Sequence, residues 1–185
     1  MYTKARIAGH PIHPMLVAFP IGLYGATIAA LLAFLGTHDA FYFRAAMTAN
    51  IAGVVMAGLT AIPGVIDLMS LPRHSQARSV GWQHAGFNVA SLLLFVISAA
   101  MLYGRWSDRT SVELDATLPL AVGMIGLVTT VIAGSLGWAM VQTHHVGVKP
   151  RFDESRRPAR PVVADAVPLA HRITGRYNVQ SHVHH

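Results

Sequence analysis

Four long apolar stretches constrain this chain more than any other feature of its sequence. They cover residues 14–35, 43–66, 85–103 and 118–141, and none of them contains Lys, Asp or Glu. Arg44, at the edge of the second stretch, is the one arginine within them. About 20 apolar residues, rising about 1.5 Å each along a helix, cross the hydrocarbon core of a bilayer. The pattern therefore predicts four transmembrane helices over these ranges.

A soluble four-helix bundle is the alternative, but each of its helices would need a polar face toward water. The four stretches show no such faces, and only 12% of the chain is charged, against about a quarter in an ordinary soluble domain. We therefore predict an all-α integral membrane protein, an antiparallel four-helix bundle over residues 1–148. Residues 149–185 are rich in proline and basic residues and are predicted to be a solvated basic tail.

The basic residues between the stretches predict the orientation of the bundle, because cytoplasmic loops carry an excess of Lys and Arg. One side holds Lys4, Arg6, Arg73, Arg78, Lys149, Arg151, Arg156, Arg157 and Arg160, whereas the other holds Arg44, Arg105 and Arg109. Both termini are therefore predicted to be cytoplasmic.

Histidine is unusually abundant, since the 11 histidines outnumber the 8 acidic residues. The predicted topology places six of them at the cytoplasmic end of the bundle: His10, His13, His74, His84, His144 and His145. Of these, His13, His84 and His145 are predicted to converge, whereas the other three fit wetted interface positions. Ionisable groups at a membrane edge are costly unless they are paired, so such a cluster is a functional hypothesis.

The chemistry of this cluster suits ligation of haem b or of a transition metal. His13 and His84 are expected to begin their helices, where the positive dipole end favours the neutral imidazole that binds a metal. Asp67, near the end of the second stretch, is a candidate metal ligand or a carboxylate that orients a ligating histidine. Asn88 and Gln142 are expected beside the cluster, although Asn88 would also suit a hydrogen bond between helices.

Other classes of function find little support. The absence of cysteine excludes thiolate metal sites, Cys-ligated iron–sulfur clusters and thioether-attached haem. No nucleophile elbow, HExxH motif or pair of carboxylates is present, so we do not expect the chain to be an enzyme by itself. The basic tail lacks interleaved aromatic residues, which argues against nucleic-acid binding. The terminal His182, His184 and His185 form no preorganised site.

The string GHPIHPMLVAFPIGL, from Gly9 to Leu23, resembles an uncharacterised bacterial membrane family, domain of unknown function 2231. The resemblance covers about residues 9–148. The family's His-Pro pattern with a second proline is matched by His13, Pro14 and Pro20. Its later features are matched by Asp67, His84 and Asn88, and its ending approximately by residues 145–148.

The resemblance implies a multi-pass protein of the bacterial inner membrane. Some relatives are joined to Rieske iron–sulfur domains, which implies exchange with electron carriers and favours a redox role. Two functions follow as expectations. The first is electron transfer through a haem b or metal held by the histidine cluster, in contact with a redox or respiratory membrane complex. The second is a non-catalytic membrane subunit or assembly factor that packs against a larger complex through its glycine and alanine stripes. The oligomeric state stays open.

Overall fold

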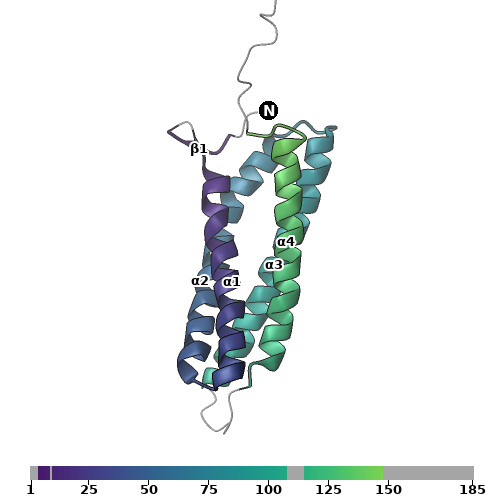
Figure 1. The fold of residues 1–185 in the computed structure, drawn as a ribbon. Coiled ribbons are helices and arrows are strands. Elements are labelled where there is room, and N and C mark those ends of the chain that lie inside the picture. Colours follow the sequence, from purple (N-terminus) through teal and green to yellow (C-terminus); the bar gives the residue numbers. More distant parts are fainter. Residues whose placement is uncertain (1–3, 9, 108–114, 148–185) are drawn as a thin grey trace, which may run out of the picture. The chain divides into compact units, whose positions relative to one another are not determined.

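The protein folds into a bundle of four long helices that run alternately up and down (Figure 1). This computed structural model describes residues 4–8, 10–107 and 115–147. Over these residues the helices are α1 (Ile12–Thr37), α2 (Ala40–Ser70), α3 (Gln76–Ser107) and α4 (Thr117–Gln142). All four are long and apolar enough to cross a membrane, so the predicted all-α fold with four spans is confirmed. The predicted tail at 149–185 lies outside the described residues.

Each helix extends beyond the apolar stretch from which it was predicted. The largest difference is in α3, which begins at Gln76 and was expected to begin near residue 85. Ser75 starts it, because its Oγ accepts a hydrogen bond from the backbone N–H of Arg78 at 3.2 Å. Hydropathy marks the hydrocarbon core, whereas a helix can continue into the polar interface with Arg and Gln side chains. His84 consequently lies about two turns inside α3.

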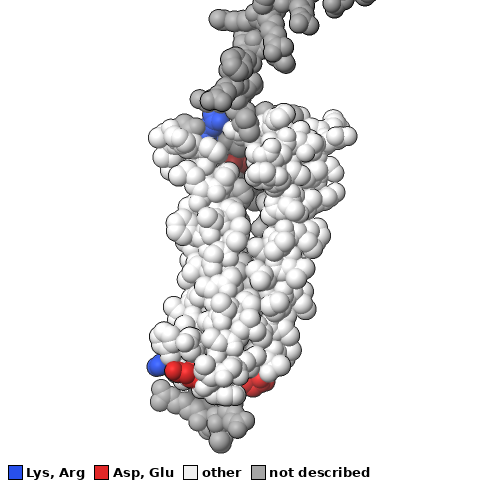
Figure 2. All heavy atoms as spheres, viewed as in Figure 1, with Lys and Arg blue, Asp and Glu red and all other residues white. Residues whose placement is uncertain are grey.

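The outer surface of the bundle suits lipid. Inside the most apolar window of each helix, 28% of the residues of α1 and 22% of those of α2, α3 and α4 are buried, so most apolar side chains face outward. Exposed examples on three helices are Val55, Leu93 and Val131. On the face shown in Figure 2, charged side chains gather at the two ends and the long middle carries none.

A short antiparallel strand pair precedes α1. It joins β1 (Arg6–Ile7) to β2 (His10–Pro11), and it was not predicted, because two-residue strands leave no periodic pattern in a sequence. His10, with His74, His144 and His145, lies at the end of the bundle where α1 and α3 begin. We call this end the histidine end.

The core is best filled away from the histidine end. At the opposite end, Leu31, Phe34, Phe43 and Leu102 form the largest buried cluster. By contrast, no residue of α1 from 12 to 19 and none of α3 from 82 to 90 is buried. The two hairpins, α1–α2 and α3–α4, therefore separate toward the histidine end, and Figure 2 shows the surface hollowed between them there.

The two hairpins repeat one packing arrangement. Tyr24 of α1 and Phe95 of α3 stack at the centre of the bundle, with ring centroids 3.6 Å apart and planes 1° apart. Gly53 of α2 lies against Tyr24, and Gly126 of α4 lies against Phe95. A Cβ at Gly53 would approach the Tyr24 ring to 2.8 Å, and one at Gly126 would approach the Phe95 ring to 2.9 Å. Glycine at both positions lets each ring lie directly on the neighbouring helix.

Asn50 supplies a buried polar contact between the hairpins. Its side chain is fully buried in α2 and contacts α3. With Nδ2 donating to the Phe95 carbonyl at 3.1 Å, its Oδ1 accepts from Ser98 Oγ at 3.2 Å. A polar side chain in hydrocarbon has no water as an alternative partner, so this contact favours one registry of α2 against α3.

We expect Asn50→Ala to destabilise the bundle by about 1 kcal/mol, the scale of a hydrogen bond between membrane helices. Unfolding of the full chain in bicelles by a denaturing detergent would measure the loss. The exposed Thr48 on the same helix gives the control Thr48→Ala, which should leave the midpoint unchanged. Equal midpoints for Asn50→Ala and wild type would contradict the assignment.

Candidate cofactor site between two histidines

The structure brings His13 and His84 together between the two hairpins. His13 is the second residue of α1, and His84 lies in α3. Their ring centroids are 6.2 Å apart and their ring planes are at 89°. Both side chains are half-buried. Two of the three histidines predicted to converge are therefore neighbours.

Each imidazole is anchored in the same way to the partner helix of its own hairpin. His13 Nδ1 lies 3.0 Å from the carbonyl oxygen of Thr60 in α2, and His84 Nδ1 lies 2.8 Å from that of Ala133 in α4. A carbonyl oxygen can only accept a hydrogen bond, so Nδ1 must be the donor in both rings. A neutral ring that carries its proton on Nδ1 has its lone pair on Nε2, the nitrogen left for a metal.

Two glycines make these carbonyls reachable. Gly64 is four residues after Thr60, and Gly137 is four residues after Ala133. In a helix, a side chain leans over the turn that precedes it, so a Cβ at either glycine would cover the acceptor carbonyl. At Gly64 that Cβ would lie 2.8 Å from Cε1 of His13, and at Gly137 it would lie 3.1 Å from Cε1 of His84.

Asn88 lies beside His84, as expected from its place one turn further along α3. Its Nδ2 donates to the backbone oxygen of His84 at 2.8 Å and lies 3.2 Å from Nε2 of the same ring. Because Nδ1 of His84 is a donor, Nε2 is the nitrogen that accepts from the amide. Asn88 therefore contacts the side of the ring that a ligand would use.

Asp67 has partners other than an imidazole. Its Oδ1 accepts hydrogen bonds from the backbone N–H groups of Lys4 at 2.9 Å and Ala5 at 3.0 Å. These bonds fasten the segment before β1 to α2. A role for Asp67 as a metal ligand, or as the carboxylate that orients a histidine, stays a prediction.

His145 and Gln142 lie at the end of α4, which closes at Gln142. Both side chains are exposed, and His145 has a left-handed backbone with φ of 51°. Within residues 4–8, 10–107 and 115–147, no three His, Asp or Glu side chains form a group that could hold a metal ion. The set of His13, His84, His145 and Asp67 is thus not assembled here, and the roles of His145 and Gln142 stay predictions.

Sequence reasoning missed the parts of the site that are not side-chain ligands. The carbonyls of Thr60 and Ala133 carry no sequence signature, and the sequence predicts only a packing role for its glycine and alanine stripes. A signal was nevertheless present: the spacing from Gly53 to Gly64 equals that from Gly126 to Gly137. The prediction that His84 begins its helix is wrong, because His84 lies beyond the first turn of α3. Only His13 lies at a helix N-terminus, where the positive dipole end acts.

Comparison with known proteins places the chain in a family. A family model described as "Predicted membrane protein (DUF2231)" matches residues 9–150. The chain therefore belongs to this family of predicted membrane proteins, as the resemblance implied. No curated protein matches the chain, and no solved structure does.

We expect Gly64→Ala and Gly137→Ala to displace the imidazole from its carbonyl, because the added Cβ occupies the position of the ring edge. Imidazole ¹⁵N spectra of detergent-solubilised apoprotein would report this. In wild type both rings should be in the Nδ1–H tautomer, and each variant should lose that state for its own histidine. We also expect a loss of about 1–3 kcal/mol of stability from overpacking.

The matched controls are Gly58→Ala on α2 and Gly134→Ala on α4, where a Cβ meets nothing within 4 Å. They should leave both tautomers intact and leave stability equal or slightly raised, because alanine favours a helix. Unchanged histidine tautomers in Gly64→Ala and Gly137→Ala would show that the glycines do not set the anchoring.

Proposed function

We propose that this protein binds haem b between His13 and His84 and carries electrons within the membrane. The observation that supports this most is the paired anchoring of the two imidazoles. Ligating histidines usually donate their second ring nitrogen to a carboxylate, a backbone carbonyl or water, which fixes the tautomer and raises the basicity of the ligand. His13 and His84 both have this arrangement, with a backbone carbonyl at Nδ1.

His13 and His84 are the residues that would hold the haem. The centroids of His13 and His84 are 6.2 Å apart. One or two side chains would be enough to hold a haem, whereas a structural zinc ion takes four. The pair therefore favours haem over a bare metal ion.

The surroundings of the pair also suit a planar apolar group. The residues of α1 and α3 around the two histidines are not buried, and the space between the hairpins opens at this level. Because Gly64 and Gly137 have no Cβ, the two rings can lie directly against α2 and α4. The stacked Tyr24 and Phe95 rings close the space toward the middle of the bundle.

The contribution of the chain is to hold and insulate the group. Bound haem supplies one-electron exchange at its iron. The hydrogen bonds to Thr60 and Ala133 fix the orientation of both rings and leave Nε2 as the nitrogen without the proton. At His84, Nε2 would have to exchange its contact with the Asn88 amide for the iron. The apolar helices lower the local dielectric, which is one of the properties that sets a reduction potential.

The proposed location is the bacterial cytoplasmic membrane, with both termini in the cytoplasm. Among the described basic residues, Lys4, Arg6, Arg73 and Arg78 belong to the histidine end, whereas Arg44 and Arg105 belong to the other. This asymmetry supports the orientation under the positive-inside rule.

Cysteine accessibility can test the orientation, because the chain has no cysteine of its own. In intact spheroplasts, a membrane-impermeant maleimide should label Asp39→Cys, in the α1–α2 loop, and should not label His74→Cys until the membrane is permeabilised. Labelling of His74→Cys alone in intact spheroplasts would reverse the proposed orientation.

The haem proposal predicts a pigmented protein. Full-length protein expressed with sufficient haem and purified in detergent should show a Soret band, a reduced α band and about one haem per chain. His13→Ala and His84→Ala should each lose most of the bound haem. His84→Met should retain haem with a raised reduction potential, because a Met/His pair raises the potential of haem iron.

The control is His38→Asn, at the opposite end of the bundle, where asparagine tolerates the left-handed backbone of His38. It should keep the wild-type spectrum. A colourless, iron-free wild-type protein with unaltered stability in His13→Ala and His84→Ala would refute the proposal. Retention of a membrane partner by those colourless proteins would favour the alternative, a non-catalytic subunit or assembly factor.

A further inference from the structure

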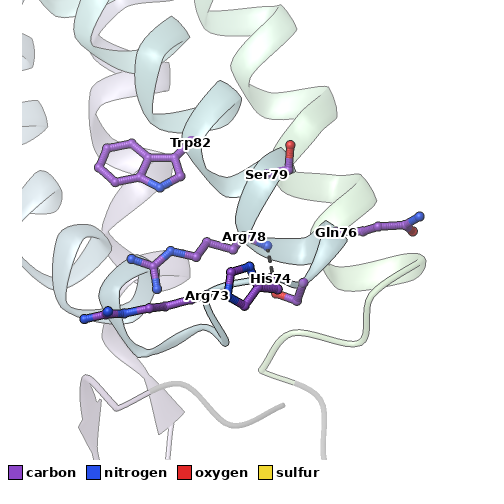
Figure 3. Close-up of a pocket in the computed structure, with 7 residues that line it drawn as sticks. Arg73, His74, Gln76, Arg78, Ser79 and Trp82 are labelled. Atoms are coloured by element: carbon purple, nitrogen blue, oxygen red, sulfur yellow. Dashed lines mark hydrogen bonds between the residues drawn. The ribbon is translucent and has the colours of Figure 1, made fainter.

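A second polar site lies on the surface of the histidine end, away from the His13–His84 pair. It is an open hollow of about 370 Å³ where the loop after α2 meets the first two turns of α3. Its lining includes Arg73, Ser75, Arg78, Ser79 and Trp82. Figure 3 shows the two guanidinium groups and the indole ring extending toward the same side.

The guanidinium of Arg78 is held in place by the loop. Its Nη1 donates to the carbonyl oxygen of Leu71 at 2.9 Å, and its Nη2 lies 3.9 Å from Sδ of Met69. An arginine carries five N–H donors, so these two contacts fix the planar group and leave donors for a ligand. Arg73 is exposed beside it and adds a second positive charge.

The two charges are not neutralised by carboxylates in the part of the chain that the structure describes. There the only ion pair is that of Arg105 with Asp115, at the opposite end of the bundle. No acidic residue lines the hollow. Two neighbouring guanidinium groups are the chemistry that binds a phosphate group, which arginine can hold through two parallel hydrogen bonds.

The position of the hollow indicates where that phosphate comes from. Trp82 is 52% exposed, and tryptophan favours the level of the lipid headgroups, where its ring is apolar on one side and polar on the other. Arg73 lies in the loop between α2 and α3, and Arg78 lies in the first turn of α3, one helical turn before Trp82. Basic pockets at this level between membrane helices bind the headgroups of anionic lipids.

We propose that Arg73, Arg78 and Trp82 form a binding site for the phosphate group of an anionic phospholipid, with the acyl chains against the apolar surface of α3. The site is independent of the proposed haem. A lipid headgroup and free phosphate share the recognised chemistry, but only the lipid also uses Trp82 and the apolar surface beside it.

The test is native mass spectrometry of the delipidated full-length protein, incubated with equal amounts of phosphatidylglycerol and phosphatidylethanolamine of the same chain length. We expect wild type to retain phosphatidylglycerol preferentially. The double variant Arg73→Ala/Arg78→Ala should lose that preference, by about 10- to 30-fold for two charges near the surface. Arg73→Lys/Arg78→Lys keeps the charges without the planar fork and should fall between them.

The control variant is Arg44→Ala/Arg105→Ala, which removes the same charge at the opposite end and should keep the preference. Equal retention of phosphatidylglycerol by wild type and Arg73→Ala/Arg78→Ala would overturn the site. Saturation by millimolar inorganic phosphate without selectivity for phosphatidylglycerol would overturn the lipid as its ligand. A soluble, monodisperse double variant with an unchanged helical spectrum is the condition for comparing these outcomes.

Discussion

An imidazole N–H placed among apolar helices has to find an acceptor inside the protein, because hydrocarbon offers none. Both His13 and His84 meet this requirement with a helix carbonyl of the neighbouring helix. This choice has structural consequences beyond the two rings. A Cβ one turn after the acceptor would meet the imidazole ring in both hairpins, so glycine at positions 64 and 137 leaves room for this contact. The same contacts hold α1 close to α2 and α3 close to α4 at this level of the bundle.

The contact between histidine and helix carbonyl occurs in both hairpins, in the same arrangement. In each hairpin, one glycine receives the histidine, and a second glycine three helical turns away receives an aromatic ring. The aromatic rings stack against one another with their centroids 3.6 Å apart, whereas the histidines stay 6.2 Å apart. The bundle is therefore closed at its middle and opens toward the histidine end. A ligand between the hairpins would consequently meet two ring nitrogens that are held in equivalent ways.

Much of the fold could be predicted from sequence, because a helix that crosses a membrane has to be long and uncharged. The four apolar stretches therefore indicate four transmembrane helices. The ends of the helices could not be predicted, because a helix continues into the polar interface after its apolar stretch has ended. The start of α3 shows the largest error. For the site, topology correctly brought His13 and His84 to one end. It could not distinguish them from His145, because convergence depends on which face of each helix turns inward. The partners of Asp67 could not be predicted either, because they are backbone N–H groups of a segment with no sequence pattern.

The two halves of the pair differ in one polar group. Asn88 follows His84 by one helical turn and contacts its Nε2, and the residue at the same place after His13 is Val17. The surroundings of the two histidines are therefore not equivalent, because an amide contacts the ring of His84 and the position one turn after His13 holds a hydrocarbon side chain. Under the proposed function, a haem between the two rings would meet a different neighbour at each of them.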